Sequence, residues 1–428
     1  MRQSWYGRVW RWHFYAGLIS LPFVFLLAVT GMIYLFKPAL DAWSERAYDH
    51  LALSAPPRSL DDQVAAARAA LPAAKVKGVE WRADPADAAR VLMLDKEGKP
   101  FRILVRPDDL SVLAVLPERG RITEVIRRLH GELLAGEAGA ILVETVGAWG
   151  LVLFGTGLYL WWPRGQGLAG VLYPRLKSGR TWRDLHAVAG FWISLAALFF
   201  LVSALPWTKV WGGAFKQVQT YAVGRGGDWT TGPASEHAMH MHELAEASAP
   251  AASSIGYSDV AARAAQADLA APVLLLPPGG RQRNWIIRSE SQNRMLRRSV
   301  EIDPATGKIS GGKGFSDRAV IDRVVGITTS MHEGHLFGPL NQLFGVVTGL
   351  TLCAMAVSAA AMWLGRNRPG LGAPPAAKSG RGAALLAGGV LLVAVLLPTL
   401  GVSLLLVTLL EWLALRRIAP AARWLGLR

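Results

Sequence analysis

The chain has 428 residues, of which 52% are hydrophobic and only 18% are charged, and its mean hydropathy is +0.27. This balance is too apolar for a soluble protein of this length and indicates several membrane spans. The net charge of +15 does not indicate nucleic-acid binding, because the excess basic residues lie beside apolar segments rather than in a soluble patch. Cys353 is the only cysteine, which excludes disulfides within the chain, iron–sulfur clusters and thioether-linked haem.

Apolar runs divide the sequence into spans and loops. Four runs are long enough to cross a hydrocarbon core of about 30 Å, which needs roughly 20 helical residues. A fifth run is interrupted by Pro398 and Gly401, and we expect a tight hairpin of two helices there, with one long span as the alternative. The predicted order is an N-terminus with the first span (1–36), a loop domain (37–139), the second span (140–162), a loop (163–185), the third span (186–207), a loop domain (208–340), the fourth span (341–364), a loop (365–382), the hairpin (383–415) and a tail (416–428).

The distribution of Lys and Arg predicts how the spans are oriented. The N-terminus, the two short loops and the C-terminal tail together hold 16 basic groups against one acid, Asp184. Cytoplasmic loops next to spans carry an excess of Lys and Arg, so we expect these segments and both termini in the cytoplasm of a bacterium. The two long loops would then lie in the periplasm, and the membrane would be the inner membrane.

Each long loop is predicted to hold a small α+β domain. In the first, residues 61–71 have helical spacing, and VKGVEWR, ARVLMLD and FRILVRP alternate or run apolar as strands do. The second loop repeats this with a helix over 257–269, the strands APVLLLP, NWIIRSE and RRSVEID, and the turn DPATGK. The expected fold is a mainly α integral membrane protein with a four-helix transmembrane core, a C-terminal helical hairpin and two small α+β periplasmic domains.

Four histidine motifs repeat in the two halves of the chain. Two motifs place a His at the expected cytoplasmic end of a span, RWHFYAG at His13 and DLHAVAG at His186. The other two place a His on the expected periplasmic side, LHGELLAG at His130 and MHEGHLFG at His332. Two pairs of imidazoles are therefore expected at two membrane depths. Two imidazoles from facing helices can supply both axial ligands of a haem, an arrangement that favours electron transfer, and ordinary interfacial histidines are the alternative.

Together these motifs resemble a known family. The ordered set of four His motifs, combined with loop modules that carry FRILVRPDDLSVL and SVEIDPATGKI, is similar to the PepSY-associated transmembrane helix family over roughly residues 11–368. Members of that family include siderophore–iron reductases with bis-histidine b-type haems in a four-helix core. The resemblance implies PepSY-like periplasmic domains and two haem b groups, with His13 and His186 serving a cytoplasmic-side haem and His130 and His332 serving a periplasmic-side haem.

Other polar residues are candidates for assisting roles. Arg127 and Arg128, on the periplasmic side, could form ion pairs with haem propionates. His237, His240 and His242, in the tract HAMHMH, lie beside two methionines and could bind copper, and a loop with chance histidines is the alternative.

The sequence supports two classes of function. The first is a di-haem transmembrane reductase that takes electrons from quinol or a cytoplasmic reductase and reduces a ferric siderophore or another Fe(III) chelate, since reduction weakens binding by hard oxygen donors. A variant of it would pass electrons to copper or to a partner protein. The second is a haem-free sensor whose PepSY-like domains bind peptides or regulate a peptidase. The sequence has no Walker loop or dinucleotide-binding fingerprint, so a separate electron donor is expected.

Overall fold

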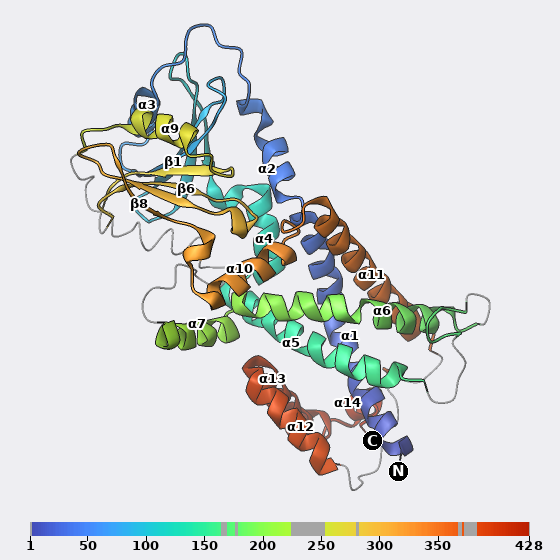
Figure 1. Cartoon of the computed structure of the whole chain (residues 1–428). Coiled ribbons are helices and arrows are strands. Elements are labelled where there is room, and N and C mark those ends of the chain that lie inside the picture. Colours follow the sequence, from blue (N-terminus) through green and yellow to red (C-terminus); the bar gives the residue numbers. More distant parts are fainter. Residues whose placement is uncertain are drawn as a thin grey trace. The chain divides into compact units, whose positions relative to one another are not determined.

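Figure 1 shows the computed structural model of the chain. It describes residues 2–163, 169–175, 179–223, 253–279, 282–366, 370–371 and 383–427. The chain forms two compact units. The membrane unit comprises Met1–Ile33, Arg128–Phe215 and Leu343–Arg428, and the sheet unit comprises Tyr34–Arg127 and Lys216–Gln342.

Long apolar helices make up the membrane unit. Within the described residues, five helical segments are long and apolar enough to cross a membrane, so the chain is a multi-pass membrane protein. The corresponding helices are α1 (Arg2–Tyr34), α5 (Gly136–Trp161), α6 (Thr181–Ala204), α11 (Pro339–Leu364) and α13 (Pro398–Leu410). The last of these continues as a π-helical turn (Glu411–Leu415), so that the fifth segment reaches Leu415. The first four match the predicted core spans. Helix α1 begins earlier than its apolar run because nothing in the preceding RQSWYGRVWRW terminates a helix.

The apolar C-terminal region forms two helices, as predicted. Helix α12 (Ala383–Leu396) ends before Leu397, and Pro398 begins α13, because proline is tolerated in the first turn of a helix but not in its interior. The backbone N–H of Leu371, which precedes α12, donates to the carbonyl of Trp424, which follows α13, at 2.7 Å. Helices α12 and α13 also pack against each other, as the two arms of a hairpin do.

Polar contacts fix two helices against α5. The indole N–H of Trp149 donates to the hydroxyl of Ser403 on α13 at 3.1 Å. The buried carboxylate of Glu144 accepts hydrogen bonds from the backbone N–H groups of Val210 at 2.7 Å and Trp211 at 3.0 Å, which are the first residues of α7 (Val210–Val223). A carboxylate at this position satisfies N–H groups that have no partner within their own helix, so Glu144 acts as a helix cap.

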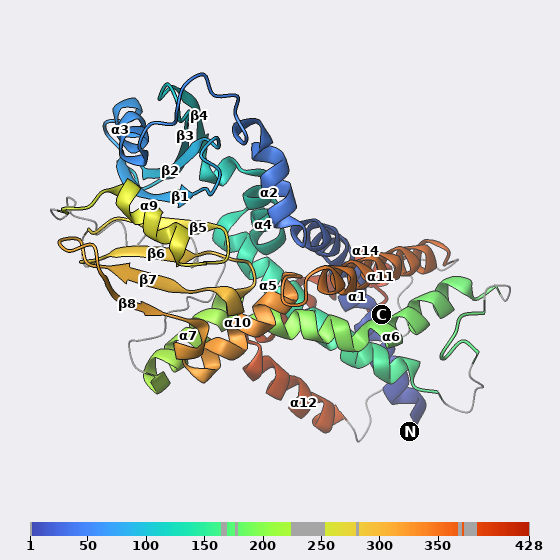
Figure 2. The same ribbon diagram turned by 45° about the horizontal axis from the view of Figure 1, so that its top comes forward.

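A single antiparallel sheet of eight strands forms the centre of the sheet unit. Its order is β4-β3-β2-β1-β5-β6-β7-β8, so the four strands of the first long loop lie on one side of the four strands of the second (Figure 2). The bounds are β1 (Lys75–Trp81), β2 (Ala89–Leu94), β3 (Pro100–Val105), β4 (Val112–Pro117), β5 (Val273–Leu276), β6 (Trp285–Ser289), β7 (Ser299–Ile302) and β8 (Ile309–Lys313), with helices α3 (Leu60–Ala70) and α9 (Tyr257–Gln266). The two sets of strands join through β1 and β5, where Val79 lies opposite Leu275.

This arrangement differs from the expectation of two separate domains. Each module alone would expose β1 or β5 as an unpaired edge, and pairing these edges satisfies the backbone groups of both. Gly78 permits the close approach, because a Cβ at this position would lie 2.7 Å from the carbonyl oxygen of Leu275. Asp61, from the first module, caps α9 of the second by accepting from the N–H groups of Tyr257 at 2.7 Å and Ser258 at 3.0 Å.

Helices α3 and α9 pack on the same face of the sheet. The side chains of a strand alternate between its two faces, and β2 places Val91 and Met93 on this one. They share one core with Val64 of α3 and Val260 of α9, all fully or almost fully buried. A common core across both modules means that they fold as one body.

The opposite face of the first four strands carries a buried network of ion pairs. Arg102 of β3 lies 2.8 Å from Glu118, 3.0 Å from Glu80 and 3.2 Å from Glu45. Arg90 of β2 lies 2.9 Å from the same Glu45. The side chains of Arg90 and Arg102 are only 2% and 6% exposed, so these charges are shielded from water. Each buried charge is therefore stabilised mainly by its ion-pair partners.

The short helices that adjoin the spans along the chain were not predicted from the sequence. They include α2 (Lys37–Glu45), α4 (Ile122–Glu132) and α10 (Val320–His332). Helix α4 carries His130 and is followed by Leu133 and Leu134 with φ of 50° and 58°, which turn the chain before α5 begins. Helix α10 ends at His332, and Gly334 with φ of 80° follows it. His130 and His332 therefore each lie near the end of a short helix rather than at the start of a span.

Candidate functional site

His13 of α1 and His186 of α6 lie close together in the membrane unit, as the repeat predicts. Their ring centres are 6.3 Å apart and their ring planes make an angle of 82°. A metal–nitrogen bond of about 2.0 Å, together with about 1.1 Å from the nitrogen to the ring centre, would place two axial imidazoles about 6.2 Å apart. The observed spacing therefore agrees with two imidazoles that would bind one metal centre.

A hydroxyl of the neighbouring span orients the ring of His13. Its Nδ1 lies 2.9 Å from Oγ1 of Thr156 on α5. The hydroxyl proton of Thr156 is already donated to the carbonyl of Val152 at 2.7 Å, so its oxygen accepts from the Nδ1–H of His13. This hydrogen bond selects the tautomer in which Nε2 has a free lone pair, the form that binds a metal.

His186 is held in the same tautomer. Its Nδ1 lies 3.0 Å from the carbonyl oxygen of Met355 on α11, and a carbonyl can only accept, so Nδ1 carries the proton. The hydroxyl of Ser358, one turn further along α11, lies 3.4 Å from the same nitrogen. Thr156, Met355 and Ser358 all contact these two rings at Nδ1. Both rings thus keep the nitrogen that a metal would need.

His130 has surroundings that match those of His13. Its Nδ1 lies 3.0 Å from Oγ1 of Thr30 on α1, and the Thr30 hydroxyl donates to the carbonyl of Leu26 at 2.8 Å. The oxygen of Thr30 therefore accepts from Nδ1–H, which is the tautomer that keeps a lone pair on Nε2. Burial lowers the pKa of His130, which favours the neutral imidazole that metals bind.

Glycine follows the threonine in both of these contacts. A Cβ on Gly157 would lie 3.3 Å from Cε1 of His13, and a Cβ on Gly31 would lie 3.2 Å from Cε1 of His130. The absence of a side chain at these two positions lets the imidazole edge rest against the helix backbone.

His332 lies in the sheet unit, at the end of α10. The adjacent Glu333 forms an ion pair with the buried Arg294 at 2.7 Å, and the hydroxyl of Ser330 accepts from the backbone N–H of Arg294 at 2.9 Å. These contacts fix the last turn of α10. The pairing of His332 with His130 remains a prediction from the repeat.

The two candidate propionate-binding arginines are engaged by carboxylates on their own helix. Arg127 lies 2.6 Å from Glu124, and Arg128 lies 3.4 Å from Glu132. Their role toward a haem remains a prediction. The tract with His237, His240 and His242 lies outside the described residues.

One further cluster of possible metal ligands lies at the surface of the sheet unit. His50, Asp84 and Asp87 have ligand atoms within 4.8 Å of one another. His50 is exposed and its Nδ1 lies 2.7 Å from Asp84, while Arg82 lies 2.9 Å from Asp87 and balances its charge. Ion pairing explains this cluster without a metal.

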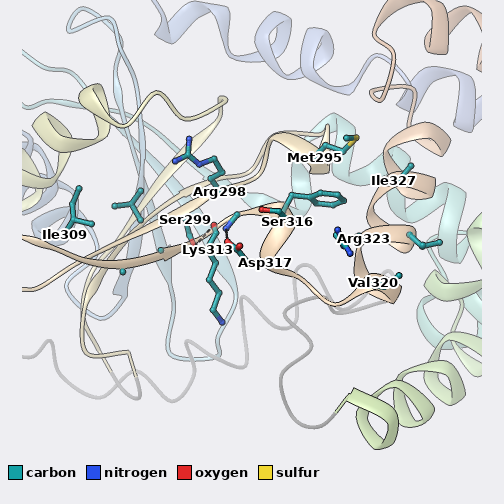
Figure 3. A pocket seen from close by; sticks show the side chains of 16 residues that line it. Met295, Arg298, Ser299, Ile309, Lys313, Ser316, Asp317, Val320, Arg323 and Ile327 are labelled. Atoms are coloured by element: carbon teal, nitrogen blue, oxygen red, sulfur yellow. Dashed lines mark hydrogen bonds between the residues drawn. The ribbon is translucent and has the colours of Figure 1, made fainter.

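An open pocket of about 1020 Å³ lies in the sheet unit beside β8 and α10 (Figure 3). Arg298, Lys313 and Arg323 line it together with Asp317. In Figure 3, Arg298 and Lys313 point in opposite directions, so the basic groups do not converge on one point. The Asp317 carboxylate accepts from the backbone N–H of Gly314 at 2.6 Å. Arg298 and Lys313 therefore do not form a joint anion-binding site in this pocket.

The residues that the sequence analysis missed are the hydroxyl partners of the histidines. A register that runs through both halves contains them: Thr30 lies 17 residues after His13, and Ser203 lies 17 residues after His186. Likewise, Thr156 lies 26 residues after His130, and Ser358 lies 26 residues after His332. Each hydroxyl residue is followed by Gly or Ala. Aligning the two halves on their histidines would have identified these positions.

Comparison with known protein families places most of the chain in one family. The profile of the family described as PepSY-associated TM region matches residues 10–366, a range that includes all four histidines of the repeat. A search of curated proteins gives no match. Because the profile covers most of the sequence, the chain belongs to the PepSY-associated TM family.

Proposed function

We propose that the chain is a di-haem b electron-transfer protein of a bacterial inner membrane that reduces ferric chelates, such as siderophore-bound iron, in the periplasm. The geometry of His13 and His186 supports this most. Their ring centres are 6.3 Å apart, and each Nδ1–H is held by an oxygen acceptor of a neighbouring span. Two ordinary interfacial histidines would need neither this spacing nor a common tautomer.

The residues of the chain prepare the sites rather than perform the redox chemistry. A haem with two imidazole ligands supplies a reversible one-electron couple without an open coordination position. His13 and His186 would hold one haem at the cytoplasmic side through Nε2, and His130 and His332 would hold the second at the periplasmic side. Two sites near opposite faces would divide a hydrocarbon core about 30 Å thick into shorter steps for an electron.

The proposed direction of transfer follows from charge and topology. The short segments with 16 basic groups would face the cytoplasm, together with both termini, and the sheet unit would face the periplasm. Electrons would come from quinol or a cytoplasmic reductase. In the periplasm, one electron converts Fe(III) to Fe(II), which hard oxygen donors bind less tightly, so the chelate releases its iron.

The alternatives are a haem-free PepSY sensor and a haem protein that serves copper or a partner protein. The geometry of His13 and His186 favours electron transfer over the haem-free sensor, because a sensor needs no two imidazoles at this spacing with each Nδ1–H held by an acceptor. Experiment must distinguish an Fe(III) chelate from copper or a partner protein as the electron acceptor.

A reduction assay tests the proposed acceptor. The purified protein is reduced, freed from excess reductant without oxygen, and mixed with a ferric hydroxamate chelate in the presence of a strong Fe(II) trap. We expect about two equivalents of Fe(II) per chain, because each of two one-electron sites delivers one electron. The His50→Ala variant should behave the same, since His50 is an exposed surface residue. Reduced protein that stays reduced in the presence of the chelate would rule out Fe(III) chelates as its acceptor.

A further inference from the structure

We infer that Thr156, Thr30 and Ser358 are positioning residues for the haem ligands: their hydroxyl groups help to hold each imidazole in one tautomer and tune how strongly each histidine binds the iron. This inference rests on the proposed function, because it assigns residues that act on the haem through the histidines.

The directions of the hydrogen bonds carry the argument. The hydroxyls of Thr156 and Thr30 each donate to a carbonyl one turn earlier in their own helix, that of Val152 at 2.7 Å and that of Leu26 at 2.8 Å. Each oxygen is left with lone pairs that face Nδ1 of a histidine on another element, at 2.9 Å for Thr156 and 3.0 Å for Thr30. Because the hydroxyl donates its proton to a backbone carbonyl of its own helix, its oxygen acts as the acceptor toward the histidine.

The same acceptor set recurs at three histidines. Each of these histidines hydrogen-bonds to the side-chain hydroxyl of a Thr or Ser and also to the backbone carbonyl of the residue three positions before that Thr or Ser. The pairs are Thr156 with Leu153 at His13, Thr30 with Leu27 at His130, and Ser358 with Met355 at His186. Ser203 lies at the position of the second half that corresponds to Thr30. Its hydroxyl donates to a carbonyl of its own helix as well, that of Phe200 at 3.2 Å. Such repetition across independent elements is not expected of threonines that only bond to their own helix.

The hydrogen bonds and the ligand pairs connect different parts of the repeat. Thr156 and His13 both belong to the first half, and Ser358 and His186 both belong to the second, so each half fixes its own imidazole. The pair of His13 and His186 then joins the halves. The orientation of each ring is thereby set before the two ligands come together, which lowers the entropy lost when they bind one centre.

A hydrogen-bond acceptor at Nδ1–H makes the imidazole more basic and stabilises the oxidised iron. Loss of the Thr156 hydroxyl leaves His13 with the carbonyl of Leu153 as its remaining acceptor. The ligand is therefore weakened rather than lost. We expect haem affinity at this site to fall about 10-fold or more, within the range of such outer partners, and its midpoint potential to become more positive.

The test compares Thr156→Val with Thr145→Val on the same helix. Thr145 also donates to the carbonyl four residues earlier, that of Ile141 at 2.8 Å, but it is half-buried and has no hydrogen bond to a histidine within the described residues. Haem loss to an excess of a haem-binding acceptor protein and the two resolved midpoint potentials are measured for both variants. Thr156→Val should lose one of its two haems faster, with a more positive potential, while Thr145→Val should match the unchanged protein.

Two further variants separate positioning from packing. Thr156→Ser keeps the hydroxyl and should restore both the haem affinity and the potential, and Thr30→Val should shift the other haem in the same direction. If Thr156→Val matched Thr145→Val in haem loss and in potential, the inference would be overturned while the proposed function stood. A chain that binds no haem in its unchanged form would overturn the proposed function and, with it, this inference.

Discussion

His186→Ala should remove about half of the low-spin haem signal, because one of two bis-histidine sites loses an axial ligand while the other keeps both. The remaining haem should be the periplasmic-side one, and Fe(III) chelate reduction driven from the cytoplasmic donor should be lost, since a chain of two carriers fails when either is lost. His332→Ala should remove the low-spin signal of the periplasmic-side haem instead. The cytoplasmic-side haem should remain, and the donor should still reduce it. Resolved optical and electron paramagnetic resonance spectra of the purified variants measure this.

The pairing of ligands makes this prediction specific. His13→Ala should erase the same spectral component as His186→Ala, because the two rings lie at the distance of ligands to one centre. His50→Ala, which changes an exposed surface imidazole, should leave both components intact. If His13→Ala and His332→Ala erased one component together while His186→Ala spared it, the assigned pairs would be wrong.

Arg102→Leu should destabilise the sheet unit by about 3–5 kcal/mol, the usual cost of removing one partner from a buried ion-pair network. The side chain of Arg102 is only 6% exposed and lies within 3.2 Å of Glu118, Glu80 and Glu45, so its loss leaves buried carboxylates without compensation. The measurement is proteolysis of the sheet unit in the full chain at increasing urea concentration. Arg58→Leu, which removes an exposed ion pair, should change stability by less than about 0.5 kcal/mol.

The same network predicts how stability depends on pH. Burial alone would raise the pKa of Glu45, but Arg102, Arg121 and Arg90 lower it on balance from its ordinary value of 4.5. A depressed pKa contributes stability above pH 4.5, and this contribution is lost as the pH falls from there through the lower folded value. Arg102→Leu should weaken this acid sensitivity. An Arg102→Leu protein with unchanged stability and an unchanged pH profile would show that the network contributes little to folding.

Much of the membrane unit could be predicted from the sequence because its signals are local. Apolar runs of about 20 residues identify the spans, and Pro398 marks the break in the C-terminal hairpin. The proximity of His13 and His186 followed from their equal places at the mouths of two spans. The hydroxyl partners could not be recognised locally, because a threonine in a span is ordinarily explained by a hydrogen bond to its own helix, and only the contact with a histidine distinguishes Thr156 from Thr145.

The sheet unit shows what local patterns leave out. The strand motifs identified six of the eight strands, but the pairing of β1 with β5 depends on contacts between segments almost 200 residues apart. Alternation within ARVLMLD predicts a strand but cannot show that Arg90 is buried, since a charged residue in a strand ordinarily faces water. Its carboxylate partners come from other elements, among them Glu45 at the end of α2.

The central claim, that the paired histidines hold haem, is tested most directly by the pyridine haemochrome of the protein purified after expression with ample haem. We expect about two non-covalent b-type haems per chain, with a low-spin spectrum in both redox states, because each of the two histidine pairs completes one site. A haem content near zero in a well-folded preparation would contradict the electron-transfer account. It would leave the haem-free sensor as the function to test.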